Sequence, residues 1–309
     1  MLASDPILAF NALKREEDMP LKTAIIHPVD ERSISAALCA ATQGLIVPVL
    51  VGPKARIERA AKQAGTTLGE VEIIDTQHSH AAAERGVELA VSGEVDALMK
   101  GALHTNEIMM PALNASLNLR TERRMSHAFL MRTNAYPKWL IMSDGALNIS
   151  PDLASKRWIV QNTIDLARAI GLDAPKVAIL SATEEVDPKI PSTIDAAALC
   201  KMADRKQIIG GVLDGPLAFD LAVSEDAVQA KGLVSAVAGK ADVLIVPDLE
   251  SGNMLAKQLD YLAGAQAAGL ILGAKVPIIL NSRSDSVEER IASCAVALRY
   301  HAWRKNAAR

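Results

Sequence analysis

Short apolar runs alternate with longer stretches of helical periodicity along most of this sequence. The runs are bounded by polar or glycine-containing turns, and this pattern predicts strands. The predicted strands are residues 23–26, 46–51, 72–74, 97–99, 129–131, 139–142, 177–180, 243–246, 269–272 and 276–280. Apolar residues spaced three and four apart predict helices between them. The clearest of these helices are residues 34–42, 55–64, 80–92, 155–170, 193–205, 254–263 and 287–299.

Strands that alternate with helices in this way are typical of βαβ units. We therefore expect an α/β fold with a mostly parallel sheet covered by helices. The alternation falters at residues 103–124 and 209–219. Two α/β lobes with a cleft between them fit this pattern, and ligands of such folds bind beyond the carboxyl ends of the strands.

The most informative polar turn follows the predicted strand at residues 276–280. It carries Ser282, Arg283 and Asp285, and a helix with an apolar face follows. The members of that face are Val287, Ile291, Cys294 and Leu298. An arginine at this place suits a phosphate, because its planar fork donates two hydrogen bonds to two oxygens.

Part of this turn also has a purely structural explanation. Ser286 and Glu289 have the spacing of a capping box, in which each side chain accepts from a backbone amide of the other residue. Asp285 is an alternative N-cap. Arg283 has no equally simple structural role except a surface ion pair, so it is the stronger candidate for ligand binding.

Four more polar segments follow predicted strands, at residues 99–105, 142–148, 214–220 and 246–254. In the first, Lys100, His104 and Thr105 can hydrogen-bond an anion, and the glycine after the lysine allows close backbone approach to a ligand. In the last, Ser251 is a candidate N-cap and Asn253 is available to a substrate. A capping turn explains the first two segments equally well when each is taken alone. The five polar turns together predict a lined cleft.

Composition and missing motifs narrow the function. The chain has 309 residues, a net charge of −3 and 3% aromatic residues, so nucleic acid is not an expected partner. The sequence lacks the usual signatures of dinucleotide-binding, P-loop, serine hydrolase and zinc sites. His78 and His80 have no carboxylate or thiol cluster beside them in the sequence, so we expect no metal site there.

Cysteine use and hydropathy indicate the compartment. The three cysteines lie far apart in apolar helical contexts, where we expect them to pack as free thiols. No long apolar stretch predicts a membrane span, and residues 1–10 lack the pattern of a secretory signal. We therefore expect a cytoplasmic protein.

The polar segments together resemble the phosphate acetyl/butyryltransferase family. The matching segments are Lys-Gly-Ala-Leu-His-Thr at 100–105, Ser-Asp-Gly-Ala-Leu-Asn at 143–148, Asp-Gly-Pro-Leu-Ala-Phe-Asp at 214–220, Pro-Asp-Leu-Glu-Ser-Gly-Asn at 247–253 and Asn-Ser-Arg-Ser-Asp-Ser at 281–286. They occur in family order, and the resemblance covers roughly residues 20–300. The third and fourth segments are the most distinctive.

This resemblance implies a fold of two α/β domains like that of isocitrate and isopropylmalate dehydrogenases. We place the first domain at residues 1–124 plus 272–309 and the second at residues 125–271, with the active site in the cleft. The implied reaction is acyl-CoA plus phosphate giving acyl phosphate plus CoA, by direct transfer in a ternary complex. It needs no metal, no covalent intermediate and no tightly bound cofactor, and family members usually form homodimers.

The resemblance also assigns roles to residues. Arg283 is expected to hold phosphate, and Ser282 to help stabilise the oxyanion of the tetrahedral intermediate. Glu289 stands where family acetyltransferases place an aspartate base for the CoA thiol, and Asp285 is a second candidate for that base. The expected substrate-binding residues are Lys100, His104, Thr105, Asp144, Asn148, Asp248 and Asn253.

One further departure from the acetyltransferases concerns Met110. It precedes a Pro-Ala-Leu segment where those enzymes carry an arginine, and Arg123, Arg124 or Lys100 can substitute for the lost anion contact. The Ser-Arg-Ser-Asp-Ser sequence resembles the butyryltransferases more than the acetyltransferases. It also resembles transferase halves that are fused to a hydratase-like domain. The acyl group, acetyl or butyryl, therefore stays open.

Two other functions are compatible with the sequence. A dehydrogenase of the same fold, acting on a 2-hydroxy acid with NAD and a divalent metal, would need aspartates for the metal. The available aspartates are Asp144, Asp214, Asp220 and Asp248. A non-catalytic protein that binds acyl-CoA or phosphate in the same cleft is the second alternative.

Overall fold

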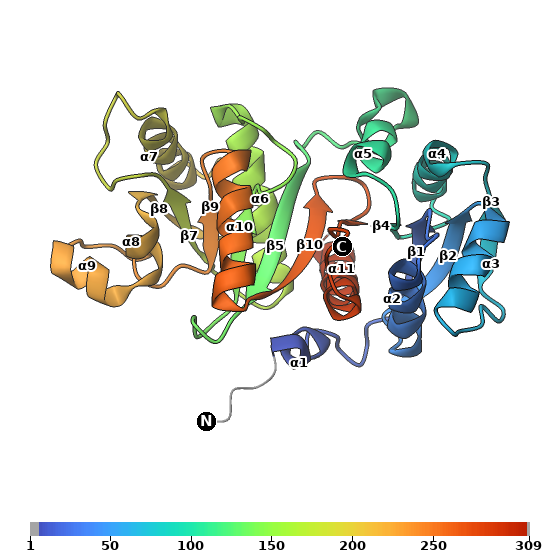
Figure 1. Ribbon diagram of the computed structural model, residues 1–309. Coiled ribbons are helices and arrows are strands. Elements are labelled where there is room, and N and C mark those ends of the chain that lie inside the picture. The colour runs from blue at the N-terminus through green and yellow to red at the C-terminus, as the bar shows by residue number, and fades with distance from the viewer. Residues whose placement is uncertain (1–5, 308–309) are drawn as a thin grey trace. The chain divides into compact units, whose positions relative to one another are not determined.

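The computed structural model describes residues 6–307, and the chain divides into two compact units (Figure 1). Arg124–Ala267 form one, here called the central unit. Ile7–Arg123 together with the stretch from Ala268 onward form the other, here called the terminal unit. Both units are built from strands and helices that alternate along the chain, which is the predicted α/β class.

In the terminal unit, the strands follow the order β3-β2-β1-β4-β11-β10. Neighbours from β3 to β11 are parallel, and β11 runs antiparallel to β10. The strands are β1 (Leu21–Ile26), β2 (Ile46–Gly52), β3 (Glu72–Asp75), β4 (Ala97–Lys100), β10 (Gln266–Leu272) and β11 (Ile278–Ile279). The helices are α1 (Pro6–Asn11), α2 (Glu31–Thr42), α3 (Lys54–Gln63), α4 (Ser79–Val91), α5 (Thr105–Leu113), the short 3₁₀ helix η1 (Ala115–Leu117) and α11 (Val287–Ala307).

The apolar runs of the sequence form these strands because helices pack against the sheet. Ile25 and Ile26 of β1, Leu98 of β4 and Ile279 of β11 are fully buried. A strand covered on both faces has a continuous apolar run and not an alternating one, as the sequence shows here. Their carboxyl ends place the polar turns side by side, because parallel strands end at the same edge of the sheet.

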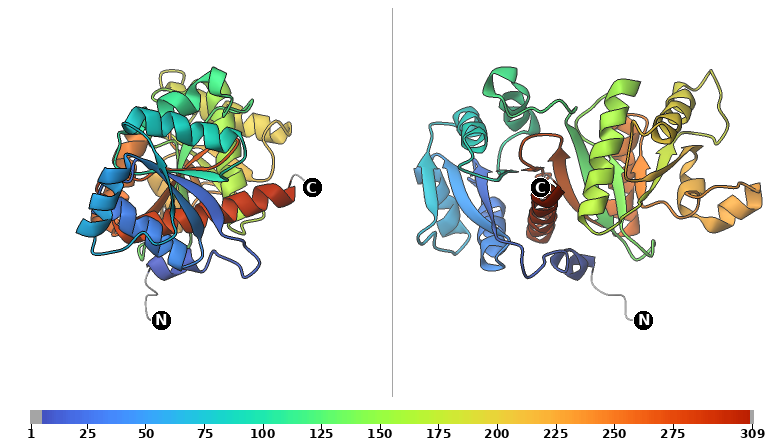
Figure 2. Two further views of the ribbon diagram at one scale, coloured as in Figure 1. Left: turned by 90° about the vertical axis from the view of Figure 1, so that its right-hand side faces the viewer. Right: turned by 180° about the vertical axis from the view of Figure 1, so that it is seen from behind.

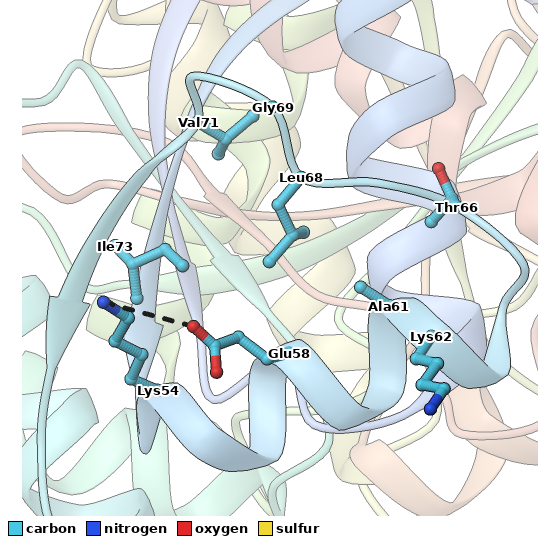
Figure 3. Close-up of a pocket in the computed structure, with 9 residues that line it drawn as sticks. All are labelled: Lys54, Glu58, Ala61, Lys62, Thr66, Leu68, Gly69, Val71 and Ile73. Atoms are coloured by element: carbon cyan, nitrogen blue, oxygen red, sulfur yellow. Dashed lines mark ion pairs between the residues drawn. The ribbon is translucent and has the colours of Figure 1, made fainter.

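A pocket opens at the edge of this unit, between α3 and the segment that leads into β3 (Figure 3). The Lys54 ammonium and the Glu58 carboxylate form an ion pair of 4.0 Å across part of its rim. Its lining residues are Lys54, Glu58, Ala61, Lys62, Thr66, Leu68, Gly69, Val71 and Ile73. None of them is a predicted site residue, so this pocket is separate from the polar turns.

In the central unit, the strands follow the order β5-β6-β9-β7-β8, parallel except for the antiparallel pair β5–β6. Helix α10 lies on one face of this sheet and α6 on the other (Figures 1 and 2). The strands are β5 (Ser126–Arg132), β6 (Leu140–Ser143), β7 (Lys176–Leu180), β8 (Val212–Leu217) and β9 (Val243–Ile245). The helices are α6 (Leu153–Ala169), α7 (Pro191–Asp204), α8 (Phe219–Val223), α9 (Glu225–Lys231) and α10 (Leu249–Ala263).

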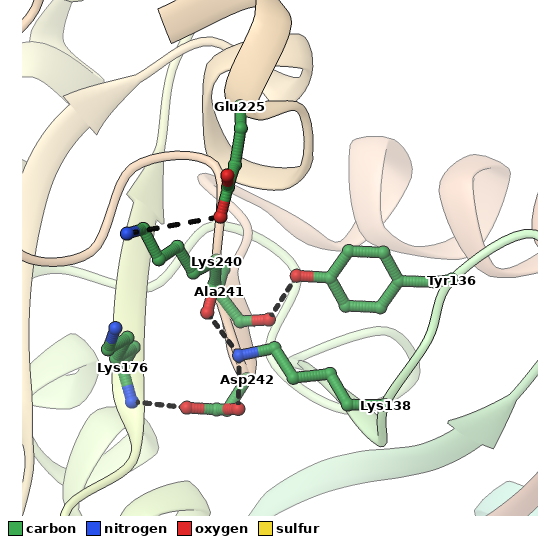
Figure 4. A network of polar contacts seen from close by, with 7 residues as sticks. All are labelled: Tyr136, Lys138, Lys176, Glu225, Lys240, Ala241 and Asp242. Atoms are coloured by element: carbon green, nitrogen blue, oxygen red, sulfur yellow. Dashed lines mark hydrogen bonds and ion pairs between the residues drawn. The ribbon is translucent and has the colours of Figure 1, made fainter.

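A polar network fastens the amino ends of the central strands (Figure 4). The Asp242 carboxylate accepts hydrogen bonds from the Lys138 ammonium at 2.7 Å and from the Lys176 backbone N–H at 2.8 Å. The Tyr136 hydroxyl donates to the Ala241 carbonyl at 2.7 Å, and burial raises the pKa of Tyr136 to about 12. The network lies before β6, β7 and β9, at the end of the strands opposite to the polar turns.

Several predicted boundaries were wrong for identifiable reasons. Strand β8 falls within residues 209–219, where an Asp-Gly-Pro segment broke the strand pattern in the sequence. Edge strands tolerate proline, and β8 is at the edge of its sheet. Helix α5 was not predicted, because Pro111 inside it interrupts the helical pattern. The strand predicted at 276–280 is only two residues long.

No helix among residues 6–307 combines the length and the apolar character that a membrane crossing requires. The three cysteines are free thiols. Cys294 is buried as expected, but Cys39 is exposed and Cys200 only partly buried, so the expected packing of all three was wrong.

Candidate functional site

The loop between β11 and α11, residues 280–286, is held through its backbone by three cationic side chains. The carbonyl oxygens of residues 281–283 each accept one hydrogen bond. Lys100 donates to the first at 3.2 Å, Arg290 to the second at 2.9 Å and Arg32 to the third at 3.1 Å. The donors come from β4, α11 and α2, so three elements fix one short segment.

Two carboxylates accept hydrogen bonds from backbone N–H groups of the same loop. Asp285 accepts from the backbone N–H of Ser282 at 2.8 Å and from the Asn281 side chain at 3.2 Å. Glu289 accepts from the backbone N–H of Ser286 at 2.9 Å, and the Ser286 hydroxyl accepts from the Glu289 N–H at 3.1 Å. These reciprocal bonds confirm the predicted capping box.

The side chains of Ser282 and Arg283 are exposed. The Ser282 hydroxyl lies 2.9 Å from that of Ser284. The Arg283 guanidinium forms no hydrogen bond or ion pair with other residues of the described chain. A fixed backbone that presents an unpaired guanidinium is suited to bind an anion from solution.

Lys100 and Arg290 are buried cations, exposed by only 3% and 2%. Within residues 6–307, neither forms an ion pair with a carboxylate. Burial, together with the positive charges of Arg290 and Arg283, lowers the pKa of Lys100 to about 8, and Asp285 and Asp30 act in the opposite direction. Burial also lowers the pKa of Arg290.

Arg290 was not among the predicted site residues. It lies three residues after Val287, so it belongs to the apolar face of α11 that the sequence already showed. A charged residue on a buried helix face needs a reason, because a charge in the interior costs free energy unless it is paired. This interruption of the apolar face was the signal that could have identified it.

The turn after β4 differs from its prediction in one respect. A Cβ atom at Gly101 would lie 2.5 Å from the Ile26 carbonyl oxygen, and the Gly101 N–H donates to that oxygen at 2.9 Å. The glycine therefore permits close packing against the end of β1, whereas we had expected close approach to a ligand. His104 and Thr105 begin α5, where the His104 N–H donates to Glu107 at 2.6 Å.

In the central unit, Asp144 and Asn148 fix the turn after β6. The Asp144 carboxylate accepts from the backbone N–H groups of His127, Ala146 and Leu147 at 2.9–3.1 Å. The Asn148 side chain donates to it at 2.6 Å. Asp144 and Asn148 are both 3% exposed. Their polar groups hold the turn, and substrate contact by either residue stays a prediction.

Helix α10 packs closely on this turn. Asp248 is its N-cap, accepting from the Ser251 N–H at 2.8 Å, so the predicted cap at Ser251 was wrong. A Cβ atom at Gly252 would lie 2.7 Å from the Asp144 carbonyl oxygen, so only glycine fits there. The Asn253 side chain donates to the Gly145 carbonyl at 3.3 Å. The helix start and the turn thus form one unit.

These contacts also bear on the aspartates that a metal-dependent dehydrogenase would need. Asp144 and Asp248 accept hydrogen bonds from backbone amides, and Asp214 accepts from the Gly215 N–H at 2.8 Å. Residues 6–307 contain no group of three histidines, cysteines, aspartates or glutamates arranged to hold a metal ion. The geometry of these aspartates is therefore that of turns and helix caps.

Comparison with known proteins decides the family. Residues 79–298, more than half of the chain, match the family described as Phosphate acetyl/butaryl transferase. The chain belongs to this family. The resemblance found in the polar segments is therefore confirmed.

The relatives of this chain include both phosphate acetyltransferases and phosphate butyryltransferases. A Rhizobium meliloti protein named Phosphate acetyltransferase is 55% identical over 290 residues, which cover 94% of this chain and 92% of the relative. A Clostridium acetobutylicum protein named Phosphate butyryltransferase is 40% identical over 276 residues, covering 89% and 92%. Both relatives belong to the acyltransferase class that the polar segments indicated.

Solved structures agree with the predicted fold. A branched-chain phosphotransacylase from Enterococcus faecalis V583 has a TM-score of 0.79 at 29% identity, covering 91% of this chain and 99% of that one. A 4-hydroxythreonine-4-phosphate dehydrogenase from Klebsiella pneumoniae has a TM-score of 0.56 at 13% identity, covering 91% and 99%. The second likeness concerns the fold alone, and it agrees with the expected dehydrogenase-like fold.

The depressed pKa of Lys100 makes stability depend on pH. In the unfolded chain the pKa is 10.5, and in the folded chain it is about 8. Between these values the unfolded chain binds more protons, so the free energy of unfolding rises with pH. We expect wild type to gain stability relative to Lys100→Met between about pH 7 and about pH 10, measured by urea denaturation at both.

Lys257→Met, at an exposed lysine of α10, controls for the loss of a lysine as such. If wild type and Lys100→Met differ by the same free energy at both pH values, Lys100 does not have a depressed pKa.

Proposed function

We propose that this chain transfers a short acyl group reversibly between coenzyme A and inorganic phosphate. The observation that carries the proposal is the exposed, unpaired Arg283 on a backbone held by three cations, in a chain 55% identical to a phosphate acetyltransferase. The supported reaction is acyl-CoA plus phosphate giving acyl phosphate plus CoA.

Phosphate is a poor match for a thioester carbonyl, because both the nucleophile and the developing oxyanion are negative. Arg283 binds the phosphate and orients one oxygen towards the carbonyl carbon. The new C–O bond forms as the carbonyl becomes an oxyanion, which Ser282 and backbone N–H groups of the loop stabilise. The C–S bond then breaks, and the sulfur leaves with the electron pair and takes up a proton.

In the reverse direction, the CoA thiol must lose that proton before it attacks acyl phosphate. Glu289 and Asp285 are the two candidate bases. Each already accepts hydrogen bonds through one carboxylate oxygen, Glu289 from Ser286 and Asp285 from Ser282. A base in either position would therefore have a fixed orientation.

The remaining features of the proposal follow the family. We infer that coenzyme A is a substrate and that no cofactor is tightly bound. We also propose a homodimer, for which the exposed apolar residues Met254, Tyr261 and Leu262 on one face of α10 offer a surface. Free cysteines are usual in a reducing compartment and support a cytoplasmic location. The acyl group is acetyl or butyryl.

The proposal is tested by following thiol release from acetyl-CoA and butyryl-CoA with and without phosphate. We expect release that depends on phosphate with at least one of the two, because phosphate is the nucleophile. Release at the same rate without phosphate would overturn the proposal. Binding of acyl-CoA and phosphate without any release would instead indicate a non-catalytic binding protein.

Replacement of Arg283 removes the cation that orients phosphate. We expect Arg283→Ala to lower kcat/KM by about 10²-fold, equivalent to ~2–3 kcal/mol of transition-state stabilisation. The assay is phosphate-dependent thiol release, and Arg59→Ala, at an exposed arginine of α3, is the control. Unchanged turnover in Arg283→Ala would remove this residue from the mechanism.

Isosteric amides separate the two candidate bases from their structural roles. Glutamine keeps an acceptor for Ser286 and is accepted in capping boxes, so Glu289→Gln should keep the cap. Asparagine in Asp285→Asn likewise keeps an acceptor for the Ser282 N–H. We expect the variant that lacks the base to lose about 10²–10⁴-fold of rate with CoA and acyl phosphate, with its melting temperature retained. Full rates in both variants would exclude both residues as the base.

A further inference from the structure

We propose that Arg290 is a positioning residue for acyl transfer. By holding the Ser282 carbonyl, it orients the Ser282–Arg283 peptide so that the Arg283 backbone N–H becomes a donor to the oxyanion. This inference rests on the proposed function and adds to it a residue that contacts no substrate. It also specifies which backbone amide of the loop does the work.

Peptide geometry links the two ends of this arrangement. The Ser282 carbonyl accepts from the Arg290 guanidinium at 2.9 Å and from the Asp285 N–H at 3.4 Å. Among the described residues, the Ser282–Arg283 bond is not one of the cis peptides, and in a trans peptide the N–H points opposite to the C=O. Because the carbonyl points to the buried Arg290, the Arg283 N–H points towards the exposed side of the loop.

Three peptides have carbonyls that the cations hold, and among the described residues only the one between Ser282 and Arg283 has an N–H without an acceptor. The Ser282 N–H, in the peptide that Lys100 holds, donates to Asp285 at 2.8 Å. The Ser284 N–H, in the peptide that Arg32 holds, contacts the Ser282 hydroxyl at 3.4 Å. The Arg283 N–H donates to no acceptor within residues 6–307. The peptide held by Arg290 is thus the one that presents a donor to a ligand.

Arg290 is a costly choice for a merely structural residue. Its Nε and Nη1 atoms are buried without a hydrogen-bond partner, so the guanidinium is only partly satisfied. A buried charge without an ion-pair partner costs free energy that an apolar side chain of similar volume would not. A function in orienting the loop accounts for a guanidinium at this buried position, because a charge-assisted bond holds a carbonyl more firmly than a neutral one.

Arg290→Met tests this role, because methionine fills the space but donates no hydrogen bond. We expect kcat to fall by about 10²-fold, as on loss of an oxyanion donor, with KM for phosphate and for acyl-CoA changed less than about threefold. Arg290→Lys should recover about tenfold of this loss, because an ammonium group can still donate to the Ser282 carbonyl.

Arg304→Met is the matched control. Arg304 lies on the same helix and donates at 3.0 Å to the Ala274 carbonyl, which is outside residues 281–283. We expect its kcat to equal that of wild type. If Arg290→Met keeps the wild-type kcat, or loses only affinity for phosphate, Arg290 does not position the oxyanion donor.

Hydrogen–deuterium exchange of the loop supplies a readout that does not depend on activity. We expect faster exchange in peptides that contain residues 281–284 of Arg290→Met, and no change in Arg304→Met. Unchanged exchange would contradict the inference even if kcat falls. A different outcome would separate the two proposals. If exchange changes as expected but wild type shows no phosphate-dependent thiol release, Arg290 does orient the loop. The proposed function and the assigned role in acyl transfer would then both be wrong.

Discussion

The organisation of this site depends on the hydrogen bonds between three cationic side chains and three consecutive carbonyl oxygens, those of residues 281–283. A polar loop beside a buried strand would otherwise sample many conformations, and each fixed residue costs conformational entropy. The loop is restricted to one conformation because hydrogen bonds attach it to β4 through Lys100, to α11 through Arg290 and to α2 through Arg32. The result is a fixed backbone that carries the exposed Arg283, whose guanidinium has no partner among residues 6–307. Binding an anion then requires little rearrangement, which is the advantage of preorganisation in electrostatic catalysis.

The same principle recurs in the central unit, with carboxylates in place of cations. The Asp144 carboxylate accepts hydrogen bonds from backbone N–H groups of its own turn, and Asp248 caps α10. Gly252 lets the helix approach the turn to a distance that any side chain would prevent. Much of the distinctive sequence of the family motifs is therefore devoted to fixing backbones, and fewer of its residues are available to touch a substrate than their polarity indicates.

The sequence predicted the fold class and most elements, because buried parallel strands and amphipathic helices leave clear periodic patterns. It predicted the capping box of Ser286 and Glu289, which is a local interaction between residues three apart. Strand β8 and helix α5 were missed because proline and glycine interrupt their patterns. Arg290 was missed because its partner, the Ser282 carbonyl, is a backbone atom brought near by the turn of the chain. Periodicity can show that a charge lies on a buried face, but it cannot show which carbonyl that charge serves.

In the proposed reaction, the loop directs phosphate, and not water, to the acyl carbon. The most direct test measures thiol and acyl phosphate together in one reaction of wild type with acyl-CoA and phosphate. Direct transfer predicts one acyl phosphate for each thiol released from the first turnover onward. Thiol release without a matching amount of acyl phosphate would mean hydrolysis, and it would contradict this account.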